Sequence, residues 1–188
     1  MAATKERALQ AAVELLGTEG VRALSHARVD QRAWLPAGST SNWFRTRRAL
    51  LAGIIDWMAE QERAGVAPPM LARPTPETIS EGLCALVLAQ TGPLAAQTRA
   101  RYALFLEIAA DDELLAPLSR QRREYEQWSD RLVADAGIPD PVPAARALMA
   151  LGDGLMLHRL TVDPELDVRP VIERAVRALA ATPPGHPA

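Results

Sequence analysis

Cysteine is almost absent from this chain of 188 residues, because Cys84 is its one copy. A single cysteine can form neither an intramolecular disulfide nor a zinc cluster, and the composition gives no other sign of a secreted scaffold. We therefore interpret Cys84 as a small apolar side chain buried on a helix rather than as a redox sensor. A reducing, cytoplasmic location is expected for the same reason.

Signatures of catalysis and of membrane insertion are missing as well. The three histidines, His26, His158 and His186, are scattered without metal-ligand spacing, and the chain has no phosphate-binding glycine loop or nucleophile motif. These absences argue against an enzyme and predict that the protein uses neither a cofactor nor a metal. No stretch approaches the ~20 apolar residues of a membrane span, and the N-terminus lacks an apolar signal region. We expect a soluble protein with no membrane partner.

The charge of the chain is unevenly distributed along its length. The formal net charge is −2, yet residues 1–48 carry eight basic and four acidic side chains, whereas the remainder carries 13 basic and 19 acidic ones. A basic head on an acidic body is typical of a protein that meets nucleic acid at one end. Solvated helix faces produce such imbalances too, so specific residues have to support this interpretation.

Apolar residues recur at helical spacing almost everywhere, and no segment shows the period-2 alternation of a strand. The sequence therefore predicts an all-α fold. We expect an N-terminal three-helix domain at residues 1–48 and a helical domain at 49–188, with a breaker-rich linker at 64–76 and a frayed tail at 182–188. The nine expected helices span residues 4–16, 26–33, 37–43, 46–62, 76–90, 94–110, 112–136, 142–162 and 168–181.

Two short helices near the N-terminus carry the most information about function. Ser25 is a good N-cap for residues 26–33, and Thr46 caps the longer helix that follows residues 37–43. Helices this short have to share a core with their longer neighbours, and we expect this core to contain Leu24, Val29, Ala33, Leu35, Phe44 and Leu50.

The polar residues left outside this core form a compact group. It consists of Ser39, Thr40, Ser41 and Asn42, flanked by Arg28, Arg45, Arg47 and Arg48. Small hydroxyls and an amide can approach base edges in the major groove of DNA, while arginines contact the phosphates on either side. The pattern therefore indicates a helix-turn-helix, although a solvated helix surface is the alternative interpretation.

Three segments of this N-terminal part resemble the TetR family of transcriptional regulators. They are VRALSHARVDQRA at residues 21–33, LPAGSTSNWF at 35–44 and TRRALL at 46–51. The family pattern is an aromatic pair that closes the recognition helix, followed by a capped fourth helix with a basic residue just after its cap. The remainder of the chain resembles the family only in the number and lengths of its helices.

The resemblance implies that residues 37–43 lie in the major groove of a double-stranded DNA operator. Ser39 and Ser41 are then the expected base readers, and Trp43 donates its indole N–H to a phosphate. Arg47 occupies the place of a phosphate-binding cation. The full set of expected DNA-binding residues is His26, Arg28, Ala37, Gly38, Ser39, Thr40, Ser41, Asn42, Trp43, Arg45 and Arg47.

Two positions depart from the family pattern. Trp34 stands where the turn usually has glycine, so either the turn differs in shape or Trp34 packs under the first helix. Asn42 replaces a common aromatic, so the operator of a relative cannot be transferred to this chain.

A homodimer is expected, because one head makes too few contacts for tight and specific binding. Two heads would then meet major grooves that lie about one helical turn of DNA apart, ~34–36 Å, or a multiple of that distance. The last two long helices are the expected interface, as the resemblance also implies, although a core within one chain is the alternative. The expected interface residues are Leu148, Gly152, Leu155, Met156, Ile172, Val176 and Leu179.

A ligand-binding cavity is expected among the middle helices. Helical bundles bind ligands with mostly apolar walls and a few convergent polar groups. Glu107 follows an apolar run and is expected to face inward. The expected lining is Trp57, Tyr102, Phe105, Glu107, Trp128, Asp153 and His158.

These interpretations predict a homodimeric repressor that a small hydrophobic or amphipathic ligand releases from its operator. The alternative is a dimeric regulator or architectural DNA-binding protein without a small-molecule ligand, either constitutive or controlled by a protein partner.

Overall fold

The computed structural model describes residues 2–65 and 74–181, and within these ranges it contains helices and no strand. The all-α prediction is therefore confirmed. The expected tail, with His186, and most of the expected linker lie outside the described residues. The elements are α1 (Ala2–Glu19), the 3-10 helix η1 (Val21–Ala23), α2 (His26–Arg32), α3 (Ser39–Trp43), α4 (Arg47–Gly65), α5 (Pro76–Thr91), α6 (Ala95–Glu107), α7 (Asp112–Asp135), α8 (Pro141–Thr161) and α9 (Arg169–Ala180).

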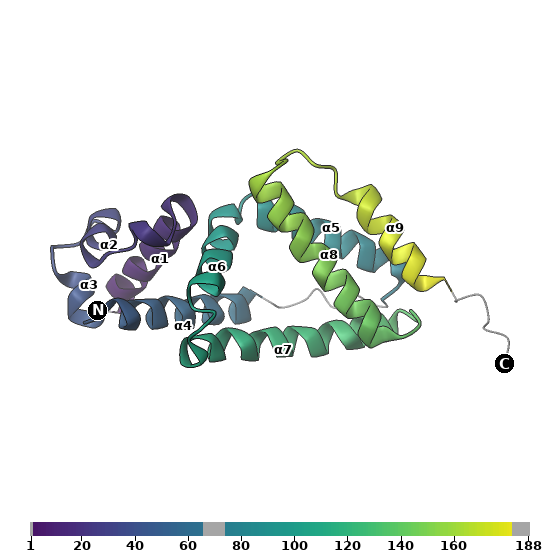
Figure 1. The fold of residues 1–188 in the computed structure, drawn as a ribbon, viewed down its shortest axis with the longest axis horizontal. Coiled ribbons are helices and arrows are strands. Elements are labelled where there is room, and N and C mark those ends of the chain that lie inside the picture. The colour runs from purple at the N-terminus through teal and green to yellow at the C-terminus, as the bar shows by residue number, and fades with distance from the viewer. Residues whose placement is uncertain (1, 66–73, 182–188) are drawn as a thin grey trace. The chain divides into compact units, whose positions relative to one another are not determined.

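The chain consists of two compact units. The head unit combines Met1–Ala67 with Leu94–Gln121, and the body unit combines Pro68–Pro93 with Arg122–Ala188. Helix α6 therefore belongs with the N-terminal helices, and Figure 1 shows it beside α1. The two packing units are not divided at residue 48. The expected boundary between a DNA-binding domain and a regulatory domain at that residue stays a prediction.

Length and composition also bear on membrane insertion. In the described ranges no single helix is long and apolar enough to cross a membrane. Helices α5 and α6 together have the length and composition of a membrane span, but they are bent by 86° relative to one another.

The core of the head unit is built on the apolar face of α1. Ile54 of α4 and Leu104 of α6 are buried in the same cluster. The expected face of α1 is confirmed, because none of its members is more than 6% exposed: Ala8, Leu9, Ala12, Val13 and Leu16. The expected short-helix core is confirmed too, with Leu35 partly buried and the others buried: Leu24, Val29, Ala33, Phe44 and Leu50.

Helices α1 and α6 come unusually close at Gly17. A Cβ atom added to Gly17 would lie 1.9 Å from the carbonyl oxygen of Ala96. No pair of nonbonded atoms tolerates that distance, so the close approach of these two helices requires glycine at this position.

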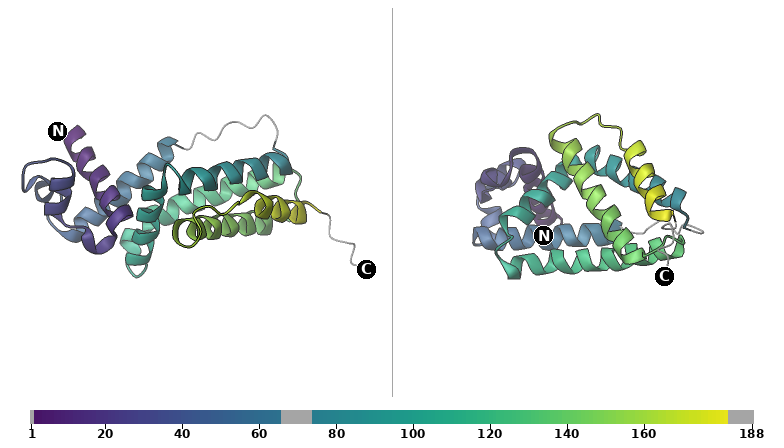
Figure 2. Two further views of the ribbon diagram at one scale, coloured as in Figure 1. Left: turned by 90° about the horizontal axis from the view of Figure 1, so that it is seen from above. Right: turned by 45° about the vertical axis from the view of Figure 1, so that its right-hand side comes forward.

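In the body unit, α5 packs against α8 and α9, as Figure 2 shows. Each of the three helices contributes buried side chains to this interior, for example Val87 of α5, Leu148 of α8 and Ile172 of α9. Cys84 is 2% exposed, and burial raises the pKa of its thiol. These observations agree with the interpretation of Cys84 as a small buried side chain.

The expected dimer interface is wrong for most of its residues. A Cβ atom on Gly152 would lie 3.2 Å from Leu83 Cδ1, so this glycine lets α8 approach α5 within one chain. The predicted stripe therefore belongs to the core of the body unit, which was the alternative. Leu179 is partly buried, and the others are buried: Leu148, Gly152, Leu155, Met156, Ile172 and Val176.

We predict opposite effects of alanine at two helical glycines. Gly17→Ala should lower the free energy of unfolding by about 1–3 kcal/mol, because the new methyl group clashes with the backbone of α6. Gly82→Ala, in α5, should raise it by up to about 1 kcal/mol, because its Cβ meets nothing within 4 Å and alanine favours the helix. Chemical denaturation measures both values, and stabilisation by Gly17→Ala would contradict the close approach.

Candidate nucleic-acid interface

Helix α2 and the turn after it set the start of α3. The Ser25 hydroxyl accepts a hydrogen bond from the Arg28 N–H at 3.3 Å, as expected for the N-cap of α2. The chain then turns through Trp34 and Gly38, whose φ angles are 54° and 88°. Gly38 adopts the left-handed conformation that glycine favours. Helix α3 therefore begins at Ser39, two residues later than expected.

Asp30 of α2 is a buried carboxylate at the start of α3, and it is 3% exposed. Its Oδ2 accepts a hydrogen bond from the Gly38 N–H at 2.8 Å. Its Oδ1 accepts from the Thr40 N–H at 2.8 Å and from the Thr40 hydroxyl at 2.5 Å. A buried carboxylate needs donors, and the first N–H groups of a helix need acceptors, so the two satisfy each other.

His26 contacts the other end of α3. Its Nε2 lies 2.6 Å from the carbonyl oxygen of Phe44. A carbonyl oxygen only accepts, so Nε2 carries the proton in this hydrogen bond. His26 and Asp30 are four residues apart and share one face of α2. Helix α2 therefore holds α3 at both ends.

The residues expected to contact DNA differ in their exposure. Thr40 is 0% exposed and its hydroxyl is bound to Asp30, so its prediction as a DNA contact is wrong. Successive residues of a helix point in different directions, so a polar run of four residues cannot lie on one surface. Among the other expected DNA contacts in residues 37–43, two are partly buried, Ser39 and Trp43. Four are exposed: Ala37, Gly38, Ser41 and Asn42.

Asp30 is not among the site residues predicted from the sequence, where it contributes only an acidic charge. A signal was present, because Asp30 directly follows the predicted core residue Val29 and lies four residues after His26. An acidic residue next to a core position and a helical turn away from a polar one can mark an internal hydrogen-bond acceptor.

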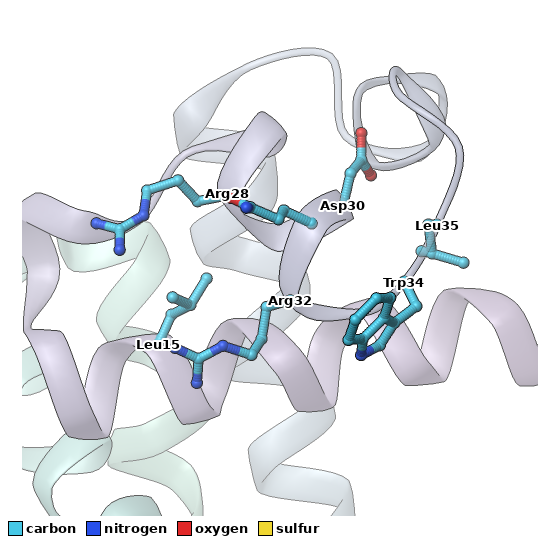
Figure 3. A pocket seen from close by; sticks show the side chains of 7 residues that line it. Leu15, Arg28, Asp30, Arg32, Trp34 and Leu35 are labelled. Carbon is cyan, nitrogen blue, oxygen red and sulfur yellow. The ribbon is translucent and has the colours of Figure 1, made fainter.

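Arg28 is engaged inside the head unit. Arg28 and Arg32 extend from the side of α2 opposite to Asp30, as Figure 3 shows. Both donate to the carboxylate of Glu19, at the end of α1. These contacts join α2 to α1, and Arg28 uses one nitrogen of its exposed guanidinium for them.

Arg47 joins the first turn of α4 to the segment before α2. Its guanidinium donates to the carbonyl oxygen of Leu24 at 2.6 Å and to that of Val21 at 3.1 Å. Glu107 Oε1 lies 3.6 Å from the same guanidinium, and Glu107 is exposed at the end of α6. The prediction that Glu107 faces inward is therefore wrong. Arg45 is exposed too, beside the end of α3.

Arg48 forms a third internal contact of the head unit. It donates to both carboxylate oxygens of Asp111, at 3.1 and 3.0 Å, and to Glu113 Oε2 at 2.8 Å. The hydrogen bond from Arg48 lowers the pKa of Asp111, and the Leu114 N–H lowers it further. The same contacts raise the pKa of Arg48. They tie the start of α4 to the segment between α6 and α7.

Trp34 adopts a left-handed backbone conformation, which glycine favours. Its φ is 54°, in the left-handed region, and its side chain is 91% exposed. Of the two alternatives considered for this turn, packing of Trp34 under the first helix is therefore excluded. The indole borders an open pocket together with Leu15, Arg32 and Leu35 (Figure 3).

The other residues expected to bind a ligand belong to different units. Trp57 and Phe105 pack against the core of the head unit. In the body unit, Asp153 pairs with Arg122 at 3.1 Å, and His158 is exposed, so its place in a ligand cavity stays a prediction. None of the predicted residues lines the pocket beside Trp34. The last two residues expected to bind a ligand are partly buried: Tyr102 on α6 and Trp128 on α7.

Comparisons with known proteins agree with this architecture. Residues 74–182 match a family model described as the tetracyclin repressor-like C-terminal domain. No curated protein matches the chain. A TetR-family member from Streptomyces coelicolor is 26% identical, with a TM-score of 0.71 over 95% of this chain and 99% of that one.

Two further solved structures have the same fold. The multidrug binding protein EbrR, in complex with imidazole, is 27% identical, with a TM-score of 0.66 over 95% of this chain and 96% of that one. Another TetR-family transcriptional regulator from Streptomyces coelicolor is 19% identical, with a TM-score of 0.75 over 96% of this chain and 95% of that one.

We predict that Asp30→Asn lowers the free energy of unfolding by about 1–3 kcal/mol, because the amide cannot accept all three hydrogen bonds and leaves a buried donor unsatisfied. Asp56→Asn, at an exposed position of α4, is the matched control and should change it by less than about 0.5 kcal/mol. Denaturation curves of both variants test this, and equal stabilities would show that the carboxylate is dispensable.

Proposed function

The chain belongs to the TetR family of transcriptional regulators, which are not enzymes, and from this premise we propose that it is a cytoplasmic, homodimeric repressor. It binds a double-stranded DNA operator with α3 and leaves the operator when a small hydrophobic or amphipathic ligand binds. The observation that carries this proposal is the attachment of α3 at both ends to α2, which leaves Ser41 and Asn42 exposed.

The exposed edge of α3 suits the major groove of DNA. Ser41 and Asn42 are small and polar, and Ala37 and Gly38 before them allow the backbone to approach closely. Arg45 is exposed just beyond α3 and is assigned to a phosphate on the groove wall. Trp43 is partly buried, and its indole N–H is assigned to a neighbouring phosphate.

A different face of α8 supports a dimer. Apolar or small residues at helical spacing remain exposed along it, and Leu157 is 51% exposed. A Cβ atom on Gly154 would meet nothing within 4 Å, so a helix of a second copy has room to approach. On α9, Val171 is 40% exposed. The proposed stripe of α8 is Ala147, Ala150, Gly154 and Leu157.

Ligand control is proposed from the family and from one relative. EbrR is described as a multidrug binding protein and is 27% identical to this chain. A ligand releases DNA only if it binds more tightly to a conformation in which the two heads no longer fit the groove spacing. A typical coupling of ~1–3 kcal/mol would weaken operator binding by about 5- to 150-fold. Trp57, Tyr102 and Phe105 remain candidates for the ligand contact.

Arg45→Gln should weaken binding to operator and to random DNA by the same factor, because a phosphate contact carries no sequence information. The dependence of log K on log salt should become shallower by about 0.9, the value of one phosphate contact. Titrations of labelled duplexes at several salt concentrations measure both quantities. Arg131→Gln, exposed on α7, is the control and should change neither. A loss restricted to the operator would contradict this role.

Leu157→Glu should raise the dimer dissociation constant by roughly tenfold or more, because each copy loses apolar contact and the two carboxylates repel across the two-fold axis. Sedimentation equilibrium measures this constant. Leu106→Glu, at a position of α6 that is 81% exposed, is the control and should leave it unchanged. An unchanged constant for Leu157→Glu would remove α8 from the interface.

A further inference from the structure

We propose that Ser41 of the recognition helix, α3, acts as a hydrogen-bond acceptor toward DNA and selects bases with an exocyclic amino group. On the strand it contacts, the operator then has adenine or cytosine opposite Ser41, and not guanine or thymine. This inference rests on the proposed function, because it assumes that α3 enters the major groove.

The three hydroxyl groups of α3 all donate their protons inside the head unit. Ser41 Oγ donates to the carbonyl oxygen of Gly38 at 2.9 Å. Ser39 Oγ donates to that of Pro36 at 2.6 Å, and the Thr40 hydroxyl donates to Asp30. A hydroxyl has one proton and two lone pairs. Each of these oxygens therefore has only lone pairs left for an additional partner.

Ser41 is the hydroxyl best placed to meet a base. Its side chain is exposed, whereas Ser39 is partly buried and Thr40 is fully buried. The position of Ser41 is fixed indirectly by Asp30, because the contacts of this carboxylate with Gly38 and Thr40 set the rotation of α3. The lone pairs of Ser41 thus point outward from a helix that cannot turn freely.

The major-groove edges of the bases divide into donors and acceptors. Adenine and cytosine present amino groups, N6 and N4, whereas guanine presents the acceptors N7 and O6 and thymine the acceptor O4. An acceptor such as Ser41 Oγ therefore matches the amino groups of adenine and cytosine. The sequence of α3, Ser39–Trp43, contains no lysine or arginine, so the helix itself carries no cation for guanine.

The size of the preference follows from the internal hydrogen bond of Ser41. To donate to guanine or thymine, its hydroxyl has to leave the Gly38 carbonyl. A net hydrogen bond corresponds to a preference of about two- to tenfold for adenine or cytosine. A phosphate oxygen is also an acceptor, so Ser41 is equally unsuited to a phosphate, and its removal should leave the salt dependence unchanged.

The experiment is a quantitative selection from random duplexes with the full-length wild-type protein, Ser41→Ala and Ser41→Asp. We expect one position in each half-site at which the wild type prefers adenine or cytosine by about two- to tenfold. Ser41→Ala should remove this preference and leave the other positions and the salt slope unchanged. Ser41→Asp has only acceptor atoms, so it should keep the preference while binding more weakly, because its charge repels phosphate.

Three results would overturn the inference while the proposed function stands. The position that Ser41→Ala affects could favour guanine or thymine, Ser41→Ala could leave every position unchanged, or it could weaken binding to all duplexes equally. If the wild type enriches no sequence and binds no duplex, the proposed function itself fails. The two failures are therefore distinguishable in one data set.

Discussion

A carboxylate removed from water has to be surrounded by hydrogen-bond donors, and in this protein that requirement orients helix α3. The donors around Asp30 come from the start of α3, so burial of the carboxylate and the placement of α3 occur together. Thr40 points inward as a result, and Ser41 and Asn42 are left outside. His26 on the same face of α2 restrains the other end. The exposed surface of α3, which we propose to meet DNA, is thus a consequence of an internal polar contact.

The basic charge of the head is largely used within the protein. Arg28, Arg47 and Arg48 hold α1, the segment before α2, and the segment after α6. Each is exposed, so water and salt weaken its ion pairs, and their main effect is to fix geometry. A count of positive charges in the sequence therefore overstates the number of guanidinium groups that are free to meet phosphate.

Local patterns predicted the helices well, because caps and apolar spacing act over a few residues. Ser25 and Thr46 cap as expected, with the Ala49 N–H donating to Thr46 Oγ1 at 3.0 Å. What could not be predicted depends on partners distant in the sequence. Helix α8 is apolar on several faces, so spacing could not decide which face meets α5 and α9 and which remains exposed. The predictions for Glu107 and Thr40 failed for the same reason. Glu107 pairs with Arg47 and Thr40 with Asp30, and both partners are distant in the sequence.

The turn at Trp34 also gives the head a spectroscopic probe. Of the four tryptophans, Trp43 and Trp57 pack against the head core, and Trp128 lies beside Tyr125, with 5.3 Å between ring centroids and 32° between the ring planes. The indole of Trp34 is 91% exposed on a backbone fixed by its left-handed φ. We therefore expect the emission of a water-exposed indole from Trp34 and, with a quencher dissolved in the solvent, stronger quenching of Trp34 than of the other three. Intrinsic fluorescence therefore reports on whatever covers this corner of the molecule, without a label.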